Sequence, residues 1–567
     1  MKTLRQFTQD HRHLLIAAIF GAAAFLCIFG IEPLRYTGIN WTLRGYDNTD
    51  ITQHQTGWMF YRNSPWTFPL GIAVNLGYPE GTSTSYTDSI PVVSLLFKIL
   101  SPILPEKFQF FGIYTCFCFV MQGFFSAALI YHFTKDKFYS SIGSIIFIFS
   151  SSFLERCFRH TALSSHWLLL AGLFIYFKGK DSFPFPKQNR LWCILLSVSL
   201  GVHPYLFAMN YALFIFSIWT TLTKYRNTEK TVSSFVICNT TIFIFGYIIG
   251  FFGNKIEPDS GFGTYSLNLN ALINPNSMYH TIWSHFLRSR PTYGNQSEGI
   301  YYLGLPVFLT LLFTLLFFVI KSRNQFSNAV HSYTQLIFLM ILFTVFAISN
   351  IVTFDDKVLF SLPMPAKLYN VLNIFRASGR FFLLPYYCII LIAVTSLYKL
   401  LENNRKLLII LCIILSVSQI IDIYPGIQDL HHFFETRETN IQYSDEWQDV
   451  AKKNNTAIVF DPIADRYLAF WLAQHNFSTN MMISAEIHRN AYWEKTKTDR
   501  ERIRAGLETG SLNLDPKTIY IMENFSNNIK TKYAGQADLI SIGYVKDDIP
   551  MNYWVLCPHH DLSQIDK

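Results

Sequence analysis

Charged residues are scarce in this sequence. Asp, Glu, Lys and Arg account for 15% of its 567 residues, whereas soluble domains carry about 25%. Half of the residues are hydrophobic and 17% are aromatic. A composition so poor in charge argues against a soluble protein and indicates a membrane protein.

Cysteine is scarce as well, with nine residues that lie mostly inside apolar runs. The cysteines lack the CxxC spacing of zinc sites, so we interpret them as small buried side chains. The net charge of +8 comes from Lys and Arg residues that are distributed mostly over short loops. We therefore expect no nucleic-acid partner.

Ionisable residues are nearly missing from the hydrophobic runs until Asp422, at the edge of the last one. Ion-coupled transporters usually keep ionisable groups near the middle of the membrane. Their scarcity argues against a proton- or sodium-driven carrier and favours chemistry at the membrane surface.

Hydrophobic runs of the length needed to cross a bilayer, roughly 17–25 residues, dominate the chain up to residue 423. The first exceeds the 7–15 apolar residues of a signal peptide, so we predict that it is an uncleaved transmembrane helix. Eleven runs are found: 14–31, 109–133, 138–153, 162–177, 190–202, 204–222, 233–252, 301–320, 333–351, 381–398 and 407–423. The alternative for the pair 190–202 and 204–222, which meets at His203-Pro204, is one broken hairpin. The sequence therefore predicts a mainly α, polytopic membrane helix bundle of about 11 transmembrane helices, residues 1–424.

The distribution of basic residues predicts the orientation. With the N-terminus in the cytoplasm, the short loops that contain Lys135, Lys178, Lys224, Lys321 and Lys399 all fall on the cytoplasmic side, as the positive-inside rule requires. The long loops 32–108, 253–300 and 352–380 then lie outside, together with the tail. Removing one span from the count would invert half of this assignment.

Residues 425–567 differ from the rest because charge returns and short helical and strand patterns alternate. Helices are expected near 444–453 and 465–474, and strands at 456–460, 518–522, 539–542 and 554–556. This pattern predicts a small soluble α/β domain outside the membrane. It shows no glycine-rich phosphate loop and no catalytic triad, so we expect a binding or scaffolding role.

The first outer loop contains a polar, aromatic stretch, residues 45–70. If residues 50–61 are helical, Asp50, Gln53 and His54 share one stripe of that helix. Such a helix at the membrane interface would present a carboxylate and an imidazole to a cleft. The alternative is that Asp50 only caps the helix and that His54 is an ordinary surface residue.

Further polar residues are predicted at the outer ends of the bundle. Asp88 precedes an amphipathic run, where it could also cap a helix. Glu298 could hold a sugar hydroxyl or a metal ion, or could face water. His160 and His203 lie at outer helix ends, but the histidines form no recognised metal cluster, so the identity of any metal stays unknown.

Arg376 and Arg380 are four residues apart, which predicts that they share one helical face. Basic residues are usually depleted on the outer side, and paired arginines suit phosphate recognition. Gly379 between them would let a ligand approach the backbone. The alternative is that both side chains snorkel to lipid head groups.

Taken together, these residues resemble the GT-C superfamily of multi-pass glycosyltransferases, and more closely an uncharacterised bacterial membrane-protein family placed near it. The resemblance covers the membrane part and rests on Asp50-x-x-Gln53-His54-x-x-Gly57-Trp58, Phe60-Tyr61-Arg62, Trp66-x-Phe68-Pro69-Leu70-Gly71, Tyr86-Thr87-Asp88-Ser89-Ile90-Pro91, His160 with His166-Trp167, His203-Pro204-Tyr205, Glu298-Gly299 with Tyr302-Leu303-Gly304, and Arg376-Ala377-Ser378-Gly379-Arg380.

The resemblance implies an inverting transfer of a sugar from a polyprenyl-phosphate donor to a cell-envelope glycan or lipid acceptor, on the outer face of the bacterial inner membrane. It implies that Asp50 is the catalytic base, with Asp47 as second candidate and His54 beside them. Arg376 and Arg380 would bind the donor phosphate. The substrate-binding residues would be Asp88, Glu298, Gln53, His160 and His203.

The loop departs from the superfamily in lacking a clean DxD or ExD, since two residues separate Asp47 and Asp50. The need for a divalent cation is therefore open, and no nucleotide cofactor is expected. Two other functions are kept as alternatives: a lipid-linked glycan flippase or transporter, and a non-catalytic envelope assembly protein.

Overall fold

The structure of the protein is a computed structural model. It describes residues 10–44, 50–181, 185–252, 261–278, 282–435, 441–461, 465–484, 486–524, 526–546 and 549–559. The chain packs into two compact units. One, the helical unit, comprises Met1–Gly38, Gln109–Phe245 and Pro258–Thr436; the other, the mixed unit, comprises Ile39–Phe108, Gly246–Glu257 and Arg437–Lys567.

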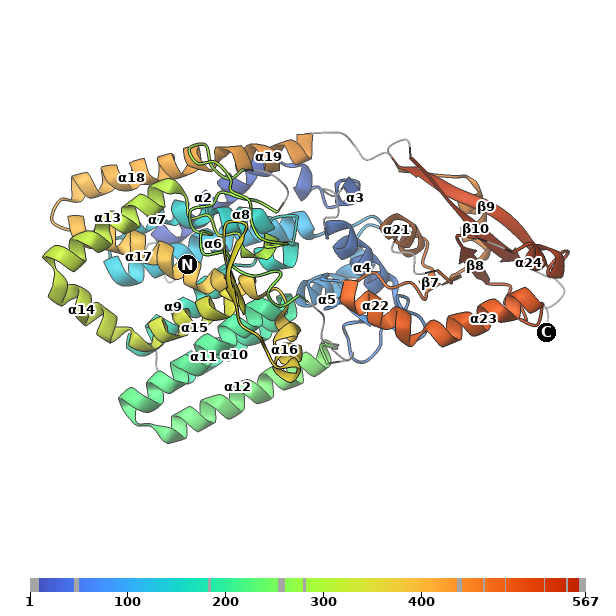
Figure 1. Ribbon diagram of the computed structural model, residues 1–567, viewed down its shortest axis with the longest axis horizontal. Coiled ribbons are helices and arrows are strands. Elements are labelled where there is room, and N and C mark those ends of the chain that lie inside the picture. The colour runs from blue at the N-terminus through green and yellow to red at the C-terminus, as the bar shows by residue number, and fades with distance from the viewer. Residues whose placement is uncertain are drawn as a thin grey trace. The chain divides into compact units, whose positions relative to one another are not determined.

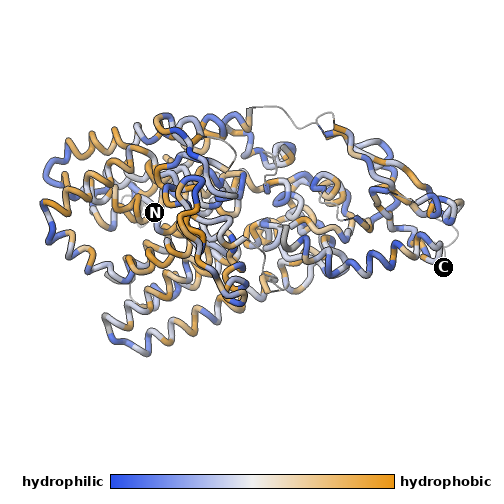
Figure 2. Tube along the Cα trace, in the orientation of Figure 1, coloured by the Kyte–Doolittle hydropathy of each residue, from blue (hydrophilic) through white to orange (hydrophobic). Residues whose placement is uncertain are grey.

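The helical unit consists mainly of helices (Figure 1). Its long elements are α2 (Arg12–Phe29), α6 (Phe111–Thr134), α7 (Lys137–Ile148), α9 (Trp167–Asp181), α10 (Phe185–Val202), α11 (Pro204–Tyr225), α12 (Thr228–Ile248), α13 (Leu305–Lys321), α14 (Arg323–Ser332), α15 (Thr334–Ile348), α17 (Leu383–Leu401), α18 (Arg405–Asp422) and α19 (Tyr424–Glu435). Figure 2 shows hydrophobic residues along helices such as α13 and α18. Helices α2, α6 and α7 contact one another, as do α9, α10 and α11.

Short elements connect these helices at their ends. They are η1 (Glu32–Leu34), α8 (Ser151–Arg156), η3 (Thr161–Ser164), η4 (Ser297–Gly299), the hairpin β3 (Ile351–Phe354) and β4 (Lys357–Ser361), α16 (Ala366–Leu372), η5 (Asn373–Phe375) and η6 (Ser378–Phe382). Of the site residues that the sequence predicts in this unit, His160, Glu298, Arg376 and Arg380 lie on or next to these short elements, whereas His203 lies at the start of α11.

The predicted count of about 11 transmembrane helices is not supported. Among the described residues, five helices are long and apolar enough to cross a membrane, and two bent pairs would raise the number to seven. Several predicted spans fold into shorter helices, such as α7 and α15 with 12 and 15 residues. At 1.5 Å per residue these are about 18–23 Å long, which is less than the roughly 30 Å hydrocarbon core of a bilayer. The long apolar helices are still compatible with a membrane protein.

The mixed unit contains a six-stranded sheet in the order β5-β9-β10-β8-β6-β7. Strand β6 pairs in parallel with β7 and β8, and the other pairs are antiparallel. The elements of the tail are β5 (Ile441–Tyr443), α20 (Glu446–Lys453), β6 (Thr456–Val459), α21 (Arg466–Gln474), β7 (Ser478–Thr479), α22 (Glu486–Lys495), α23 (Lys497–Thr509), β8 (Thr518–Met522), α24 (Asn527–Lys532), β9 (Ala537–Lys546) and β10 (Ile549–Pro558). The prediction of a C-terminal domain with a sheet is confirmed.

The first predicted outer loop belongs to this same unit. It forms α3 (Trp41–Arg44), α4 (Ile51–Asn63), β1 (Ile72–Ala73), β2 (Thr82–Ser83), α5 (Pro91–Leu100) and η2 (Ser101–Ile103). Helix α4 packs against α21. Leu76 forms a parallel bridge with Thr479, and Gly77 donates a backbone hydrogen bond to Met481 O at 3.0 Å. Residues 75–78 therefore extend the sheet at β7, whereas the sequence predicts a boundary after residue 424.

One hydrophobic core of the mixed unit lies on one face of the sheet, and the other face is buried as well, since all five residues of β8 are buried. Strands β8 and β10 and the helices α23 and α24 contribute its buried side chains, which include Leu507, Tyr520, Met522, Ile529 and Leu556. In the helical unit, aromatic rings from distant segments pack edge to face, among them Phe25, Phe29, Phe119, Phe158 and Phe434. These cores fix the short elements that hold the polar residues described next.

Candidate functional site

The candidate site of the helical unit is built around Glu298, which lies on η4 and is buried. Arg156 Nη1 donates to Glu298 Oε2 at 2.6 Å, and Arg380 Nε donates to the same oxygen at 2.9 Å. Arg380 Nη2 also donates to Oε1, and His160 Nε2 lies 3.4 Å from Oε1. We call Arg156, His160, Glu298 and Arg380 the Glu298 cluster.

The arginines keep Glu298 ionised. Burial by itself raises the pKa of this carboxyl group, but the charges of Arg156 and Arg380 outweigh burial and hold the pKa of Glu298 well below its usual range. Both carboxylate oxygens accept hydrogen bonds from guanidinium groups. At neutral pH, Glu298 is therefore an anion that orients arginines and is poorly suited to proton transfer.

Close backbone packing brings the segments of this cluster together. A Cβ atom on Gly379 would lie 3.0 Å from Glu298 O, and one on Gly299 would overlap Ser266 O. Glycine at position 379 lets η6 approach η4 closely enough for Arg380 to reach Glu298, and glycine at position 299 lets η4 pack against Ser266. The prediction that Gly379 leaves room for a ligand is therefore wrong, because the backbone of η4 occupies that space.

Arg376 and Arg380 do not share one helical face, contrary to the prediction. Arg376 follows η5, Arg380 belongs to η6, and Ala377 between them has a non-helical ψ of 64°. The Arg376 guanidinium lies 5.3 Å from the centre of the Tyr265 ring, and that of Arg380 lies 4.8 Å from the centre of the Tyr205 ring. Each arginine is thus held by its own aromatic ring.

Tyr205 connects the His203-Pro204-Tyr205 motif to the cluster. Its ring lies against Arg380, and its hydroxyl accepts a hydrogen bond from Ala377 N at 3.0 Å. His203 is the N-cap of α11 and its Nδ1 accepts from Tyr205 N at 3.2 Å. This position makes His203 a capping residue that orients Tyr205, and a role in binding substrate stays a prediction.

Three charged residues in or next to the cluster were not identified from the sequence: Glu155, Arg156 and Arg159. Arg159 pairs with Glu155 at 3.1 Å and with Asp429 at 2.6 Å. The Glu155 carboxylate also accepts from Ser277 Oγ at 2.9 Å and from Trp283 Nε1. The available signal was the segment 154–160, LERCFRH, which places three charged residues between apolar runs; ionisable groups in such surroundings usually have a specific role.

The Glu298 cluster carries surplus positive charge, because two guanidinium groups face one carboxylate. The Arg156 side chain is 1% exposed, whereas that of Arg380 is 15% exposed. The accessible part of the surplus charge therefore lies at Arg380. A guanidinium group can bind a phosphate or carboxylate through two parallel hydrogen bonds, so this arrangement suits an anionic ligand.

Asp50, Gln53, His54 and Asp88 lie in the mixed unit. Asp50 occupies the N-cap position of α4, as predicted, but within the described residues its side chain makes no capping hydrogen bond. Its Oδ1 lies 3.7 Å from Arg466 Nη2 at the start of α21. Asp47 belongs to residues 45–49, which lie outside the described residues.

Helix α4 is buried on most sides instead of presenting an open polar stripe. It contacts α3, α5 and α21, and both Gln53 and His54 are buried. Ser89 Oγ donates to His54 O at 2.8 Å, and a Cβ atom on Gly57 would overlap Thr87. Two segments of the resemblance, 50–58 and 86–91, are therefore packed against each other.

Asp88 has a left-handed backbone with φ of 53°, which Asp adopts more readily than most residues. The N-cap of α5 is Ile90, so Asp88 does not occupy the capping position that the sequence left open. The predicted acids and arginines thus form two groups. Glu298, His160 and Arg380 are in contact in the helical unit, whereas Asp50 and Asp88 belong to the mixed unit.

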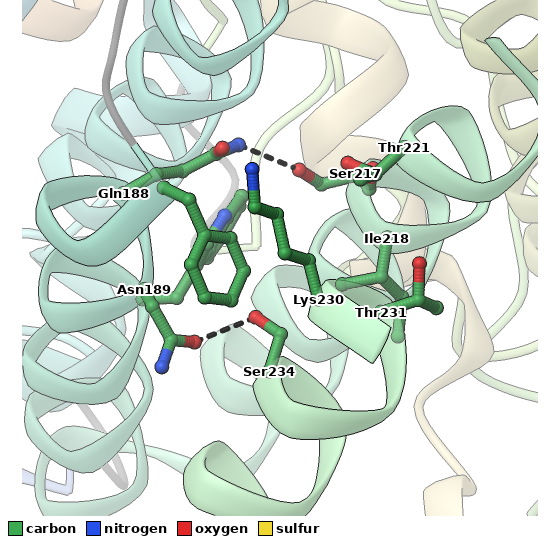
Figure 3. A pocket seen from close by; sticks show the side chains of 10 residues that line it. Gln188, Asn189, Ser217, Ile218, Thr221, Lys230, Thr231 and Ser234 are labelled. Carbon is green, nitrogen blue, oxygen red and sulfur yellow. Dashed lines mark hydrogen bonds between the residues drawn. The ribbon is translucent and has the colours of Figure 1, made fainter. Parts of the chain in front are cut away.

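A small pocket between α10, α11 and α12 contains none of the predicted site residues (Figure 3). Its polar side chains pair with one another: Gln188 Nε2 donates to Ser217 Oγ at 3.1 Å, and Ser234 Oγ donates to Asn189 Oδ1 at 2.6 Å. Ser217 lies twelve residues after Tyr205 on α11, or about 18 Å along the helix. This pocket is therefore separate from the Glu298 cluster.

In the part of the chain that the structure describes, no group of three or more His, Cys, Asp or Glu side chains is placed to hold a metal ion. The structure therefore adds no candidate ligand set for the divalent cation that the sequence left open.

Comparison with known families gives one match. Residues 18–424 match the model of a family described as a domain of unknown function, DUF6311. The match spans well over half of the chain and includes both groups of candidate site residues. No curated protein matches the chain.

Proposed function

We propose that this chain, which belongs to the DUF6311 family, is a membrane glycosyltransferase of the GT-C type. It transfers a sugar, with inversion, from a polyprenyl-phosphate-linked donor to a cell-envelope glycan or lipid acceptor. The reaction takes place on the outer face of the bacterial inner membrane, with the N-terminus in the cytoplasm.

The observation that carries this proposal is the Glu298 cluster. Transfer of the sugar leaves the donor phosphate with increased negative charge, and fixed cations aimed at that charge stabilise the transition state. Arg380 is oriented by Glu298 on one side and by the Tyr205 ring on the other. A guanidinium group held in this way needs little reorganisation when the leaving phosphate becomes charged.

The remaining parts of the cluster support Arg380. Glu298 fixes its orientation, and Arg156 supplies a second positive charge to the same carboxylate. With this second cation, the cluster as a whole stays positive although Glu298 is an anion. We assign Arg380 to the donor phosphate, and Glu298 and Arg156 to positioning it.

A lipid-linked donor also fits the five to seven helices of the described residues that are long and apolar enough to cross a membrane. Their surfaces would accommodate the prenyl chain while the phosphate lies at the helix ends. Donor binding would then depend on the membrane part of the chain.

Asp50 is the proposed base. In the reaction it removes the proton of the acceptor hydroxyl while that oxygen attacks the anomeric carbon and the bond to phosphate breaks. Arg466 lies 3.7 Å from its carboxylate and would hold its orientation. This assignment rests on the resemblance and on the partial exposure of Asp50 at the start of α4.

The test is Asp50→Asn in the native host, with surface glycans profiled by mass spectrometry. Loss of a general base lowers rates by about 10²–10⁴-fold, so one glycan should disappear or fall at least about 10²-fold. The matched control is Asp449→Asn, an exposed acid of the same unit that pairs with Lys452 at 3.0 Å. Unchanged glycans with normal amounts of Asp50→Asn protein would reject the catalytic role.

The position of the cluster within the helical unit also fits a lipid-phosphate flippase, because such a protein would need the arginines but no base. Arg380→Gln separates the two functions. A transferase should lose its product with either Arg380→Gln or Asp50→Asn. If only Arg380→Gln removes the glycan, transport is favoured over transfer.

A further inference from the structure

Helix α5 has its polar and apolar faces reversed relative to a helix of a soluble domain. Its polar residues Ser94 and Lys98 are buried, and Lys98 is only 4% exposed. Leu96, Ile99 and Leu100 are exposed instead. Helices at a water-facing surface normally bury their apolar stripe and expose their charges, so this helix is not built to face water.

The orientation of α5 is fixed by the contacts of Lys98. Its Nζ donates to Tyr61 O at 2.8 Å and lies 4.1 Å and 4.9 Å from the centres of the Tyr61 and Trp66 rings. The described residues place no carboxylate within salt-bridge distance of this ammonium group, and burial lowers the pKa of Lys98 to about 8. The inward direction of Lys98 therefore leaves the apolar side of α5 facing outward.

This apolar side is part of a larger surface. Trp66, which contacts Lys98, is exposed, as are Phe68 on the same turn and Ile103 on η2, which is 81% exposed. We call the following residues the α5 face: Trp66, Phe68, Leu96, Ile99, Leu100 and Ile103. Exposed apolar surfaces of this kind mark contacts with a protein or a membrane.

The α5 face is continuous with the end of a candidate membrane helix. Phe68 and Tyr247 have ring centres 5.5 Å apart, and Leu70 N donates to Ile248 O at 2.7 Å. Ile248 is the last residue of α12, which has the length and hydropathy of a span. If α12 crosses a bilayer, the edge of that bilayer at the C-terminal end of α12 therefore lies next to Phe68.

We propose that the α5 face is a membrane anchor, inserted at the boundary between lipid head groups and acyl chains of the bilayer that the candidate spans cross. The occupant is lipid because the face is continuous with α12 and because η2 precedes the candidate span α6 by a few residues. Trp66 at its edge is of the type that is enriched at membrane interfaces. This inference does not depend on the proposed glycosyl transfer.

The experiment places a cysteine at Ile99 of the full chain, labels it with a polarity-sensitive fluorophore, and reconstitutes the protein in nanodiscs. Lipids with a quencher in the acyl chain then report contact with the bilayer. The matched control is a cysteine at Ile549, which lies in the same unit outside the α5 face and is 64% exposed, compared with 60% for Ile99. The signal of the unmodified chain, with its nine native cysteines, is subtracted.

We expect quenching at Ile99 to be at least about threefold stronger than at Ile549, as for a side chain 5–10 Å deep in the interface. A cysteine at Ile103 should give the same result. Agreement between the two positions shows that the quenching at Ile99 is not caused by a local distortion at that one position. Equal quenching at Ile99 and Ile549 would overturn the proposal. A label at Ile99 that is shielded from both water and lipid quencher would overturn it too, because a protein surface, from this chain or a second copy, would then cover the face.

Discussion

Replacement of Glu298 by glutamine removes one negative charge from the centre of the Glu298 cluster and changes its shape little. Arg156 and Arg380 then share a neutral partner, and Arg156 is 1% exposed. Breaking a buried ion pair by removing one partner costs about 3–5 kcal/mol, because the other charge stays buried without compensation. At about 2 °C per kcal/mol for a large domain, Glu298→Gln should lower the apparent Tm by roughly 6–10 °C.

Replacement of Arg156 by methionine should cost less. Glu298 keeps two hydrogen bonds from Arg380, so the loss is about 1.5–3 kcal/mol for one charged hydrogen bond. The double variant tests the reasoning most directly. Arg156→Met removes the cation that Glu298→Gln leaves unpaired, so the two losses of stability should not add. The double variant should lose at least about 1 kcal/mol less than the sum of the losses of the two single variants.

The assay is thermal unfolding of the purified full chain in detergent, followed by intrinsic tryptophan fluorescence. Glu402→Gln is the control, since it removes an exposed glutamate that pairs with Lys399 at 2.8 Å, and surface pairs contribute about 0–1 kcal/mol. If Glu298→Gln unfolds like Glu402→Gln, or if the double variant is strictly additive, Glu298 does not hold the cluster together by charge.

Three further predictions concern pH and packing. Burial raises the pKa of Glu298, but its arginine partners lower it well below the usual range. The contribution of the ionised Glu298 to folding stability is therefore present above about pH 4.3 and is lost as the pH falls through the folded pKa. The Tm difference between wild type and Glu298→Gln should stay constant from pH 8 to 5 and shrink in more acidic buffer. Burial lowers the pKa of Lys98 to about 8, so the unfolded chain binds more protons than the folded chain between pH 8 and 10.4. The folding stability of wild type should therefore rise by about 2 kcal/mol relative to Lys98→Met between pH 7 and pH 10. A Tm difference that does not change with pH would contradict this. Gly57→Ala would overlap Thr87 and should lose about 1–3 kcal/mol by the same fluorescence assay, whereas Gly506→Ala, whose Cβ would meet its nearest neighbour at 3.3 Å, should change the Tm little.

The elements of the tail were predictable because their signals are local. The strand expected at 518–522 is β8, and the helix expected at 465–474 is α21, which begins one residue later. Asp465 caps this helix by accepting from Tyr467 N and Leu468 N. Alternating apolar residues and a capping side chain act within a few residues, so the sequence alone reveals them.

The span count failed because hydropathy does not determine helix length. The run 138–153 contains six serines and one glycine among its apolar residues, and α7 ends at Ile148 while α8 starts at Ser151. Phe149 between them has left the helical conformation, with ψ of 36°. Ser150 is the N-cap of α8, a position that serine favours, so the break coincides with the three consecutive serines 150–152.

The candidate site was only partly predictable for a similar reason. Glu298, His160 and Arg380 were each selected from the sequence, but their contact was not, since more than 80 residues separate Glu298 from either partner. Arg156 was overlooked because it lies between two runs that hydropathy assigned to spans. The predicted helical pairing of Arg376 and Arg380 failed because Ala377 interrupts the helix.

The strand pairing of residues 75–78 with β7 and the residues that follow it has a consequence for biosynthesis. The ribosome completes residues 39–108 long before it reaches residue 437, and at about 5–20 residues per second the interval is on the order of half a minute. During that time α4 lacks α21, and the segment at residues 75–78 has no strand to pair with. The early part of this unit must therefore stay unaggregated until residues 437–567 of the same unit have been synthesised.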